Sequence, residues 1–425
     1  MSVVRLRPGP VSGTVRAPPS KSYTHRALVV AHLSRRPFRV ENPLVSDDTV
    51  RTAGALRALG SRVEADRDGW SVSPDPAGTR SRRVRIDCGE SGTTLRFVTP
   101  LAALSERTVT LVGRGRLPLR PMGPLVDALR TLGVSAQLPG NNRSLPLVVK
   151  GPMHGGTVRV RGSESSQFVS ALLLALPTVS PGSVVQVVGG LVSEPYVEAT
   201  LAVLRASRVR VTSHGSRYIL SGDQKYRGTA FRVPGDASSA AYLWASAAIA
   251  GGRVTVKGVS DRWPQADLAI LRLLERYGAD VRRDEESVTV RGNGRRPFLV
   301  DLTDTPDLYP LAGVLAAAAA GESRLVGASH VAHKESDRRG GTAGLATAMG
   351  AAVRDLSGAL VVRGTKRPTP FALRGLLDHR IVMSAAVGAL AASGPSTVAD
   401  GRAVGKSYPG FWETLRAIAG KGSVS

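Results

Sequence analysis

The sequence predicts an α/β protein built from six similar units, grouped into two halves of three. Three observations predict this fold. Marker motifs recur at intervals of roughly seventy residues along the whole chain. Each interval holds one helix-length apolar segment together with short β-branched runs. The length of 425 residues is too great for one small domain and suits two domains of ordinary size.

Two independent markers define the repeat. The first is a β-branched run that ends in Gly, Asn or Asp, which predicts a strand followed by a turn. The second is the end of an amphipathic helix such as PLVDALRTLG, where Gly is the expected C-cap. The first marker ends at Asn42, Gly113, Gly189, Gly258, Gly327 and Asp400, and the second ends at Gly60, Gly133, Arg208, Gly278 and Gly350.

Each unit begins with a helix that is apolar nearly all round, such as RALVVAHL or FVSALLLALP. A helix without a polar face is normally buried. A strand, a loop and the amphipathic helix follow, and one or two short strands close the unit, as in SRVEAD and WSVSP. We therefore expect buried helices walled by sheets.

The composition is that of a globular protein with a large excess of positive charge. The hydrophobic content of 42% and the charged content of 21% exclude disorder for most of the chain. The net charge of +24 comes from 57 basic residues, of which 8 are Lys and 49 are Arg, against 33 acidic ones. This excess is consistent with nucleic-acid binding, with an anionic substrate, or with a genome that prefers arginine codons.

Cysteine content and hydropathy set the expected compartment. The single cysteine, Cys88, excludes an intrachain disulfide and a Cys-rich zinc site. The N-terminal sequence lacks the apolar core of a signal peptide, and the most apolar stretch, around residues 311–320, is too short to span a bilayer. We therefore expect a soluble, cytoplasmic protein.

The starts of the buried helices are the candidate chemical positions. Small polar residues precede each of these helices, and for any one of them N-capping is a sufficient explanation. Several starts, however, also carry a cation, although the helix dipole opposes positive charge there. A bound anion would reconcile the two, because helix N-termini favour phosphate and carboxylate. The cations are Lys21, Arg26, Arg96 and Arg380.

The loops after the strand markers agree with this hypothesis. Arg120, Tyr196, Lys334 and Lys406 follow their markers at six or seven residues, so in a repeated fold they occupy equivalent places. Surface loops are often basic, and that alternative stays open. Lysine usage is more selective, because three of the eight lysines (Lys21, Lys334 and Lys406) fall in these segments of an arginine-rich chain.

Ten motifs, in order, resemble those of the 3-phosphoshikimate 1-carboxyvinyltransferase (EPSP synthase) family, in a form closer to its archaeal members. The resemblance extends from about Ser20 to Leu415. The motifs are PPSKSYTHRALVVAHLS, GESGTTLRFVTPLAAL, LPLRPMGPLVDALR, GSESSQFVSALLLALP, LVSEPYVEATL, PGDASSAAY, TPDLYPLAGVLAA, HKESDR, LLDHRIVMSAA and VGKSYPGFWETL.

The resemblance implies the fold and the domain boundaries. It implies two similar domains, each of three βαβαββ units, in the inside-out α/β barrel of the enolpyruvyl transferases. The chain crosses between the domains twice, so residues 1–19 would join residues 235–425, and residues 20–234 would form the second domain. The active-site cleft is expected between them.

The resemblance also implies the reaction, the transfer of the enolpyruvyl group of phosphoenolpyruvate to the 5-hydroxyl group of shikimate 3-phosphate. Together the substrates carry roughly six negative charges, which would account for the converging cations. The residues implied for shikimate 3-phosphate are Lys21, Ser22, Arg26, Ser165, Ser166, Gln167, Ser193, Tyr196, Asp307, His330 and Lys334. Those implied for phosphoenolpyruvate are Lys21, Gly92, Thr93, Arg96, Arg120, Gln167, Arg338, His379, Arg380 and Lys406.

The family mechanism is addition and then elimination through a tetrahedral intermediate. Asp307 aligns with the carboxylate that takes the hydroxyl proton, and Glu335 aligns with the group that handles the methylene proton. Lys21 and Lys406 would flank the same centre. From the residues alone, Asp307 could equally cap a helix, and Glu335 could equally pair with Arg338 or Arg339.

Some positions depart from the common pattern of the family. Glu90 and Ser91 stand where many bacterial members have Asn and Ala, and His330 stands where many have Asn. An acidic Glu90 would repel phosphoenolpyruvate unless an arginine paired with it. His330 and His333 form HxxH, but without further His or Cys we expect no metal and no cofactor. Gly92 implies that glyphosate should compete with phosphoenolpyruvate.

Two other functions share some of these features. A UDP-N-acetylglucosamine 1-carboxyvinyltransferase shares the chemistry, but that family normally has a reactive cysteine in the loop that here reads GRGRLPLRPMG. A basic nucleic-acid-binding protein predicts exposed aromatic residues for stacking, yet aromatic residues are only 4% of the chain. We therefore expect small-molecule substrates, no nucleic acid or membrane partner, and a monomer.

Overall fold

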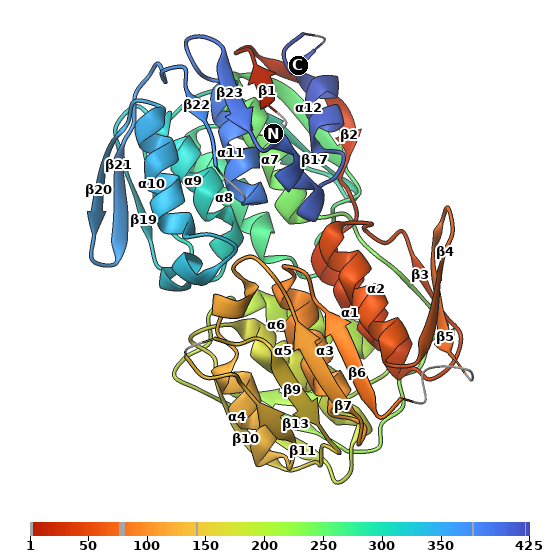
Figure 1. Cartoon of the computed structure of the whole chain (residues 1–425). Helices are drawn as coiled ribbons and strands as arrows, with labels where there is room; N and C mark the ends of the chain where they lie inside the picture. The colour runs from red at the N-terminus through yellow and green to blue at the C-terminus, as the bar shows by residue number, and fades with distance from the viewer. Residues whose placement is uncertain (1–2, 76–80, 142, 376–377, 421) are drawn as a thin grey trace. The chain divides into compact units, whose positions relative to one another are not determined.

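The computed structural model describes residues 3–75, 81–141, 143–375, 378–420 and 422–425. The chain divides into two compact units (Figure 1). Unit 1 takes the chain up to Pro18 and from Pro234 onward, and unit 2 is Pro19–Val233. The boundaries expected from the sequence fall next to these positions. Leu376 and Leu377, which open the LLDHR motif, lie outside the described residues.

Unit 2 contains three βαβαββ repeats. The first strand of its first repeat is supplied from the far end of the unit, by β14. The first repeat is β14 (Ala230–Arg232), α1 (Lys21–Leu33), β3 (Phe38–Glu41), α2 (Asp47–Ala58), β4 (Ser61–Ala65) and β5 (Gly69–Pro74). The second is β6 (Arg83–Asp87), α3 (Gly92–Ala102), β7 (Thr108–Val112), α4 (Gly123–Thr131), β8 (Ser135–Gln137) and β9 (Leu147–Lys150). The third is β10 (Thr157–Arg161), α5 (Ser166–Ala175), β11 (Ser183–Val188), α6 (Pro195–Ala206), β12 (Val211–His214) and β13 (Arg217–Leu220).

Unit 1 repeats the same order. The N-terminal segment of the chain supplies the first strand of the fourth repeat and the last strand of the sixth. The fourth repeat is β2 (Val11–Arg16), α7 (Ala237–Ala250), β15 (Gly252–Lys257), α8 (Ala269–Tyr277), β16 (Asp280–Arg283) and β17 (Ser287–Arg291). The fifth is β18 (Leu299–Asp301), α9 (Tyr309–Ala317), β19 (Glu322–Val326), α10 (Arg338–Ala348), β20 (Ala352–Leu356) and β21 (Ala359–Arg363). The sixth is β22 (Ala372–Leu373), α11 (His379–Ala389), β23 (Ser396–Ala399), α12 (Phe411–Ala419) and β1 (Val3–Leu6).

Short 3-10 helices fill several of the loops between these elements. They are η1 (Leu117–Leu119), η2 (Leu176–Thr178), η3 (Ala266–Leu268), η4 (Pro306–Leu308), η5 (Ser329–His333) and η6 (Gly401–Lys406).

Each repeat forms its own sheet, and the first five sheets share one strand order. In the second repeat the order is β6-β7-β9-β8, where β6 runs parallel to β7 and the remaining pairs are antiparallel. The sixth sheet has the order β1-β23-β22, in which β1 takes the place of a closing hairpin. The expected α/β fold of two halves with three βαβαββ repeats each is confirmed.

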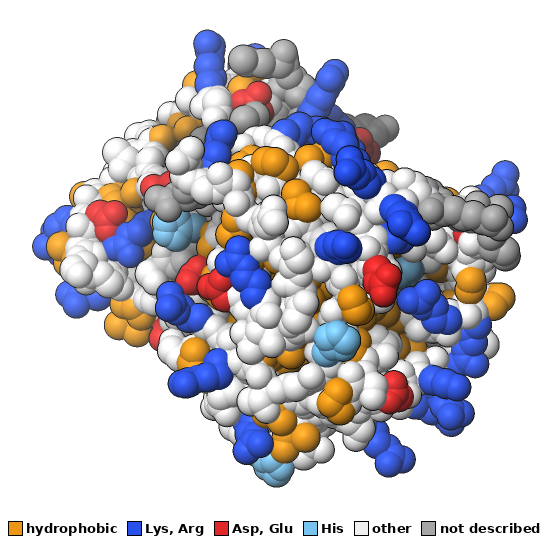
Figure 2. Space-filling view, turned by 60° about the horizontal axis from the view of Figure 1, so that its bottom comes forward, with side chains coloured by type: hydrophobic (Ala, Val, Ile, Leu, Met, Phe, Trp, Pro, Cys, Tyr) orange, Lys and Arg blue, Asp and Glu red, His pale blue; other side chains and the backbone are white. Residues whose placement is uncertain are grey.

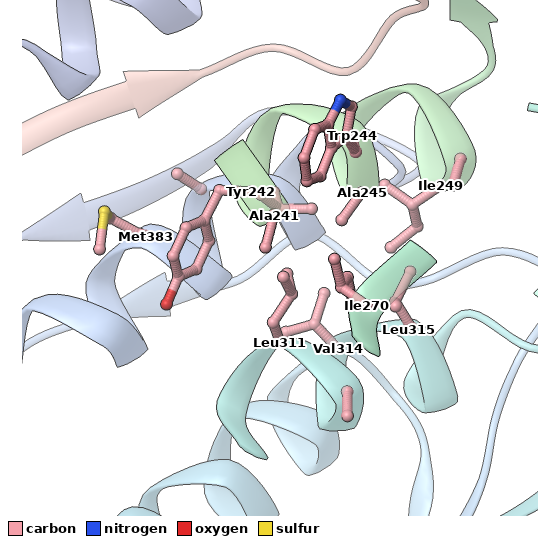
Figure 3. Close-up of a cluster of buried hydrophobic side chains, with 14 of the residues drawn as sticks. Ala241, Tyr242, Trp244, Ala245, Ile249, Ile270, Leu311, Val314, Leu315 and Met383 are labelled. Atoms are coloured by element: carbon pink, nitrogen blue, oxygen red, sulfur yellow. The ribbon is translucent and has the colours of Figure 1, made fainter. Parts of the chain in front are cut away.

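The apolar helices are buried, as their lack of a polar face predicted. In unit 1, α7, α9 and α11 pack against one another beneath the sheets (Figure 1). Figure 3 shows Ile249 of α7 near Leu315 of α9 and Ile270 of α8, with Trp244 on the opposite side of α7, and all four are fully buried. The indole nitrogen of Trp244 donates to the Val288 carbonyl, so its one polar group is satisfied.

The sequence-derived repeat began at the buried helix and did not locate the strand that precedes it. In β6 and β10, valine or isoleucine alternates with exposed arginine or another polar residue, so five residues give little apolar signal. β22 has only two residues. Pairing with the second strand of each sheet stabilises these segments, and a local pattern does not report that pairing.

None of the described helices has both the length and the apolar character needed to cross a bilayer.

Candidate active site

In unit 2, Lys21 is the first residue of α1, and its ammonium group is paired. Lys21 Nζ lies 3.1 Å from Asp48 Oδ2, in the first turn of α2. The Asp48 side chain is only 5% exposed, so this carboxylate faces the start of α1 rather than solvent. Asp48 was missed by the sequence reasoning, because an Asp at a helix start reads as an ordinary favourable charge.

Arg26 is buried one turn further along α1, and neutral acceptors hold it. Its Nε donates to Thr200 Oγ1 at 2.9 Å, Nη1 to the Ser22 carbonyl at 2.9 Å, and Nη2 to the Tyr196 carbonyl at 2.8 Å. The guanidinium also lies 5.3 Å from the centre of the Phe97 ring. No described carboxylate forms an ion pair with it. Burial lowers the pKa of Arg26 to about 10, against the opposing effect of Tyr23 and Tyr196, so the group is still charged at neutral pH.

The start of α3 positions a second arginine. Arg96 Nη1 donates to Gln167 Oε1 at 2.7 Å, and Gln167 Nε2 donates in turn to Thr93 Oγ1 at 3.0 Å. The Arg96 guanidinium stacks over the Phe168 ring at 5.1 Å. This chain of contacts joins the starts of α3 and α5.

Gly92 accommodates the Arg120 guanidinium. A Cβ at position 92 would lie 2.6 Å from Arg120 Cζ, closer than any real contact. Arg120 is only 6% exposed, so its charge lies against the backbone at the start of α3. A side chain at position 92 would therefore displace the Arg120 guanidinium, so glycine allows this close approach of a cation to the backbone.

The serines implied for phosphate binding lie at two more helix starts. Ser165 is the N-cap of α5, and its side chain accepts from the Gln167 backbone N–H at 3.3 Å. Ser166 is the buried first residue of that helix. Ser193 precedes α6 with a φ of 56°, and it is buried. Helix N-termini that present free N–H groups and hydroxyls are suited to bind anions.

In unit 1, Arg338 is the centre of a buried ion cluster. Its Nη1 donates to Asp307 Oδ1 at 2.7 Å, Nη2 to Glu335 Oε2 at 2.8 Å, and Nε to Asp378 Oδ2 at 2.9 Å. Arg338 is 1% exposed. Burial disfavours its charge, but the three carboxylates outweigh burial and raise the pKa of Arg338.

Asp307 is held by two arginines. It lies in η4, and its second oxygen accepts from Arg380 Nη2 at 2.7 Å. Burial favours its neutral form, but the charges of Arg380, Arg338 and Lys334 outweigh burial and hold the pKa of Asp307 well below its usual range. Its carboxylate is therefore used for ionic contacts with Arg338 and Arg380.

Asp378 has two functions in the same cluster. It is the N-cap of α11, where its side chain accepts from the Arg380 backbone N–H at 2.9 Å. It also accepts from Ser336 Oγ at 2.9 Å. The sequence suggested only the cap.

The other predicted residues of unit 1 lie on neighbouring segments. His330 is buried in η5, where burial and the Lys334 charge lower its pKa to about 4. Lys334 follows directly as the C-cap of η5, and Glu335 comes next. His379 is the buried first residue of α11, and Lys406 is the buried last residue of η6.

A buried carboxylate beside this cluster was missed. Asp267 accepts a hydrogen bond from Ser238 Oγ. Burial and the nearby negative charge of Asp307 raise the pKa of Asp267 to about 7. The flanking Gln265 side chain bonds the Ala237 N–H and the Gly235 carbonyl, which attaches this loop to the start of α7. In the sequence, Asp267 reads only as an acid at a helix start.

Besides His330, the two other departures from the family pattern lie just before α3. Ser91 is the N-cap of α3 and accepts from the Thr94 N–H. Glu90 is exposed, and its carboxylate lies against Gly115. Among the described residues, no group of three His, Cys, Asp or Glu side chains is arranged to hold a metal ion.

Known proteins of one family match this chain along most of its length. The family described as EPSP synthase (3-phosphoshikimate 1-carboxyvinyltransferase) matches residues 6–415. A 3-phosphoshikimate 1-carboxyvinyltransferase of Halobacterium salinarum is 42% identical over 421 residues, which cover 97% of this chain and 98% of the relative. One of Methanocorpusculum labreanum is 37% identical over 414 residues, or 96% of each chain.

Solved structures show the same fold. EPSP synthase from Acinetobacter baumannii has a TM-score of 0.80 at 24% identity and covers 100% of this chain and 99% of its own. The enolpyruvyl transferase NikO from Streptomyces tendae has a TM-score of 0.78 at 19% identity, with 100% and 98% covered. The resemblance to archaeal members is confirmed by the sequence relatives, and the chain belongs to the EPSP synthase family.

Proposed function

We propose that this chain catalyses its family's reaction. We also propose that the site residues of unit 2 and those of unit 1 have different roles in it. The enolpyruvyl group of phosphoenolpyruvate is transferred to the 5-hydroxyl group of shikimate 3-phosphate, which yields 5-enolpyruvylshikimate 3-phosphate and phosphate. Unit 2 supplies cations and helix starts for the anionic groups, and unit 1 supplies the carboxylates for proton transfer. That the two sets of site residues face one cleft remains a prediction from the family resemblance.

One observation supports the proposal most strongly, the burial of Arg26 without a carboxylate. A buried charge with only neutral partners is costly unless an anion compensates it. Shikimate 3-phosphate provides that anion, and the hydroxyls and N–H groups at the starts of α5 and α6 would surround its phosphate. The proposed contacts are Lys21, Ser22, Arg26, Ser165, Ser166, Gln167, Ser193 and Tyr196 from unit 2, with Asp307, His330 and Lys334 from unit 1.

Phosphoenolpyruvate is proposed to meet the remaining cations. Guanidinium forks bind carboxylate and phosphate through paired hydrogen bonds. Arg120, packed on Gly92, and Arg96, fixed by Gln167, are pre-positioned for this in unit 2. The proposed set is Lys21, Gly92, Thr93, Arg96, Arg120, Gln167, Arg338, His379, Arg380 and Lys406.

The proton transfers are assigned to Asp307 and Glu335. Asp307 takes the proton of the 5-hydroxyl group while that oxygen attacks C2, and C3 receives a proton from Glu335. Phosphate then leaves as C3 returns its proton to Glu335, and the departing phosphate takes up the hydroxyl proton from Asp307, so both carboxyl groups regain their starting states. Lys21 and Lys406 stabilise the negative charge around the tetrahedral intermediate. Arg380 holds Asp307 ionised, and we expect an incoming anion to draw Arg380 away and so make Asp307 more basic.

Phosphate release tests the proposal directly. The protein is mixed with phosphoenolpyruvate and either shikimate 3-phosphate or UDP-N-acetylglucosamine, and phosphate is followed with time. We expect release with shikimate 3-phosphate alone. Release with only the UDP sugar would show that the acceptor is wrong, and release with neither would reject the function.

We also propose a cytoplasmic monomer. Light scattering during gel filtration checks the oligomeric state, because a monomer has a mass of 44.5 kDa. A mass of twice that value would contradict it.

A further inference from the structure

The surface of unit 2 has a second concentration of positive charge, away from the candidate active site. Figure 2 shows Lys and Arg side chains standing over the face in view, with fewer Asp and Glu among them. A cavity of about 930 Å³ lies between the C-terminal end of α6 and the segment that follows β13. Five cations line it, namely Arg205, Arg208, Arg210, Lys225 and Arg227. We call this cavity the basic groove.

The positive charge of the basic groove is not compensated. None of its five cations forms an ion pair with a residue that the structure describes, and Asp223 is the one carboxylate in the described lining. Elsewhere on the surface, arginines lie beside carboxylates, as do Arg324 and Arg354, which both pair with Glu322. Like charges gathered in a concave site concentrate the electrostatic potential and attract anions.

The groove is held in shape by its own hydrogen bonds. The Gln224 side chain accepts from the Arg210 N–H at 2.8 Å and donates to the Arg210 carbonyl at 3.0 Å. The Arg227 N–H donates to the Ser207 carbonyl at 2.8 Å. These bonds fix the segment after β13 against the turn that follows α6, so the groove is formed without a ligand.

Arg208 gives an independent reason to regard the groove as a binding site. It occupies the repeat position at which the other amphipathic helices of the repeats have Gly60, Gly133, Gly278 and Gly350, all with positive φ. Arg208 adopts the same left-handed region with a φ of 58°, which is unfavourable for a residue with a Cβ. The chain thus has a cation where the backbone favours glycine, and this cation lines the groove.

The groove is separate from the reaction site proposed above. α6 starts at Pro195, beside Tyr196, whose carbonyl accepts from Arg26, and Arg205 is in its last turn. Nine residues of helix separate Tyr196 from Arg205, which is about 14 Å at 1.5 Å per residue.

We propose that the basic groove binds a small oligophosphate, an anion that carries several linked phosphate groups. Guanidinium groups pair well with phosphate oxygens, and the volume lies within the range of small-molecule sites. The described lining contains no aromatic side chain on which a base could stack, so the phosphates themselves are the recognised part. A triphosphate chain, either free or on a nucleotide, has this chemistry.

The test is calorimetric binding of inorganic tripolyphosphate at low salt, with shikimate 3-phosphate present to occupy the reaction site. We expect one tripolyphosphate per chain. Arg208→Gly should weaken binding severalfold and at the same time raise the unfolding temperature, because glycine relieves the left-handed backbone. A purely structural Arg208 would not give these two opposite changes together.

A triple variant and a matched control complete the experiment. Arg208→Gln with Arg210→Gln and Lys225→Gln should weaken binding at least about tenfold, with phosphate release from the catalysed reaction unchanged. Arg5→Gln with Arg272→Gln and Arg363→Gln removes the same charge from exposed positions outside the groove and should change binding less than about twofold. ATP that binds as tightly as tripolyphosphate would identify the nucleotide as a second source of the same phosphate chain.

Three results would overturn the proposal. Tripolyphosphate could fail to bind at all. Both triple variants could lose the same affinity, in which case the net charge of the chain would be responsible. A single-stranded DNA oligomer could bind more tightly than tripolyphosphate at equal phosphate concentration, which would make the groove a nucleic-acid surface instead.

Discussion

The two units each bury an arginine, and they treat its charge in opposite ways. Arg26 in unit 2 is 2% exposed and donates to two carbonyls and a hydroxyl. Arg338 in unit 1 is 1% exposed and donates to three carboxylates. Burial lowers the pKa of Arg26, whereas the carboxylates raise the pKa of Arg338 in spite of burial.

The difference indicates that the two arginines have different functions, although the two units share one repeated fold. A buried cation without a counter-ion is available to an anionic ligand, and it makes the unliganded state less stable. A buried cation among carboxylates instead fixes the positions of those carboxylates and opposes the effect of burial on the pKa of Asp307 and Asp378. Arg26 is therefore suited to binding substrate, and Arg338 is suited to organising Asp307 and Glu335.

Removing Arg338 should have the largest effect on stability. Arg338→Met leaves Asp307, Glu335 and Asp378 without their shared cation, and breaking a buried pair in this way costs about 3–5 kcal/mol. Urea unfolding measures the loss. Arg339→Met is the matched control, because Arg339 pairs with the exposed Asp355 and should cost less than about 1 kcal/mol. Equal losses in the two variants would show that the cluster contributes little to stability.

A methyl group on Gly92 should affect catalysis more than stability. Gly92→Ala forces the Arg120 guanidinium to move, because the new Cβ would lie 2.5 Å from Arg120 Nη1. We expect the KM for phosphoenolpyruvate to rise about tenfold, since a misplaced charged hydrogen bond costs of the order of 1.4 kcal/mol. Gly123→Ala, where a Cβ meets no atom within 4 Å, is the control. A KM that stays at the wild-type value would remove Arg120 from the phosphoenolpyruvate site.

The smallest effect is a pH dependence that originates in unit 1. The pKa of Asp267 is raised to about 7, so the folded state binds a proton that the unfolded state, with an ordinary carboxyl pKa, releases. Its contribution to stability is therefore present at low pH and is lost as pH rises through about 7. Between pH 6 and pH 8 the loss should be about 1 kcal/mol.

Asp267→Asn removes this titration and keeps an oxygen that can accept from Ser238. Wild type and variant should differ more in unfolding free energy at pH 8 than at pH 6, with the variant the more stable at pH 8. Parallel pH profiles would contradict the raised pKa.

The sequence predicted the cations of these sites better than their partners. Lys21, Lys334 and Lys406 stood out because lysine is rare in an arginine-rich chain, and Arg26 stood out at a helix start where the dipole opposes its charge. The carboxylates that pair with such cations are remote in the sequence. Asp48 is 27 residues from Lys21, and Asp378 is 40 residues from Arg338.

Each missed acid also has an ordinary local explanation. Asp378 is a good N-cap, and Asp267 lies in the short helix η3 that leads into α8. Only the tertiary packing shows that their carboxylates are buried beside arginine or serine. The repeat itself was predictable because its motifs recur along the chain. The short first strands of the repeats were not predictable, because they depend on pairing for their stability.

Direct binding of shikimate 3-phosphate to two variants tests whether the site residues of the two units have different roles. In calorimetry, Arg26→Met should weaken binding at least about a hundredfold, because a buried charge-assisted contact is lost, and its unfolding temperature without ligand should not fall. Asp307→Asn should bind within about tenfold of wild type while phosphate release falls by about 10²–10⁴. Equal loss of binding in both variants, or wild-type binding by Arg26→Met, would contradict the account.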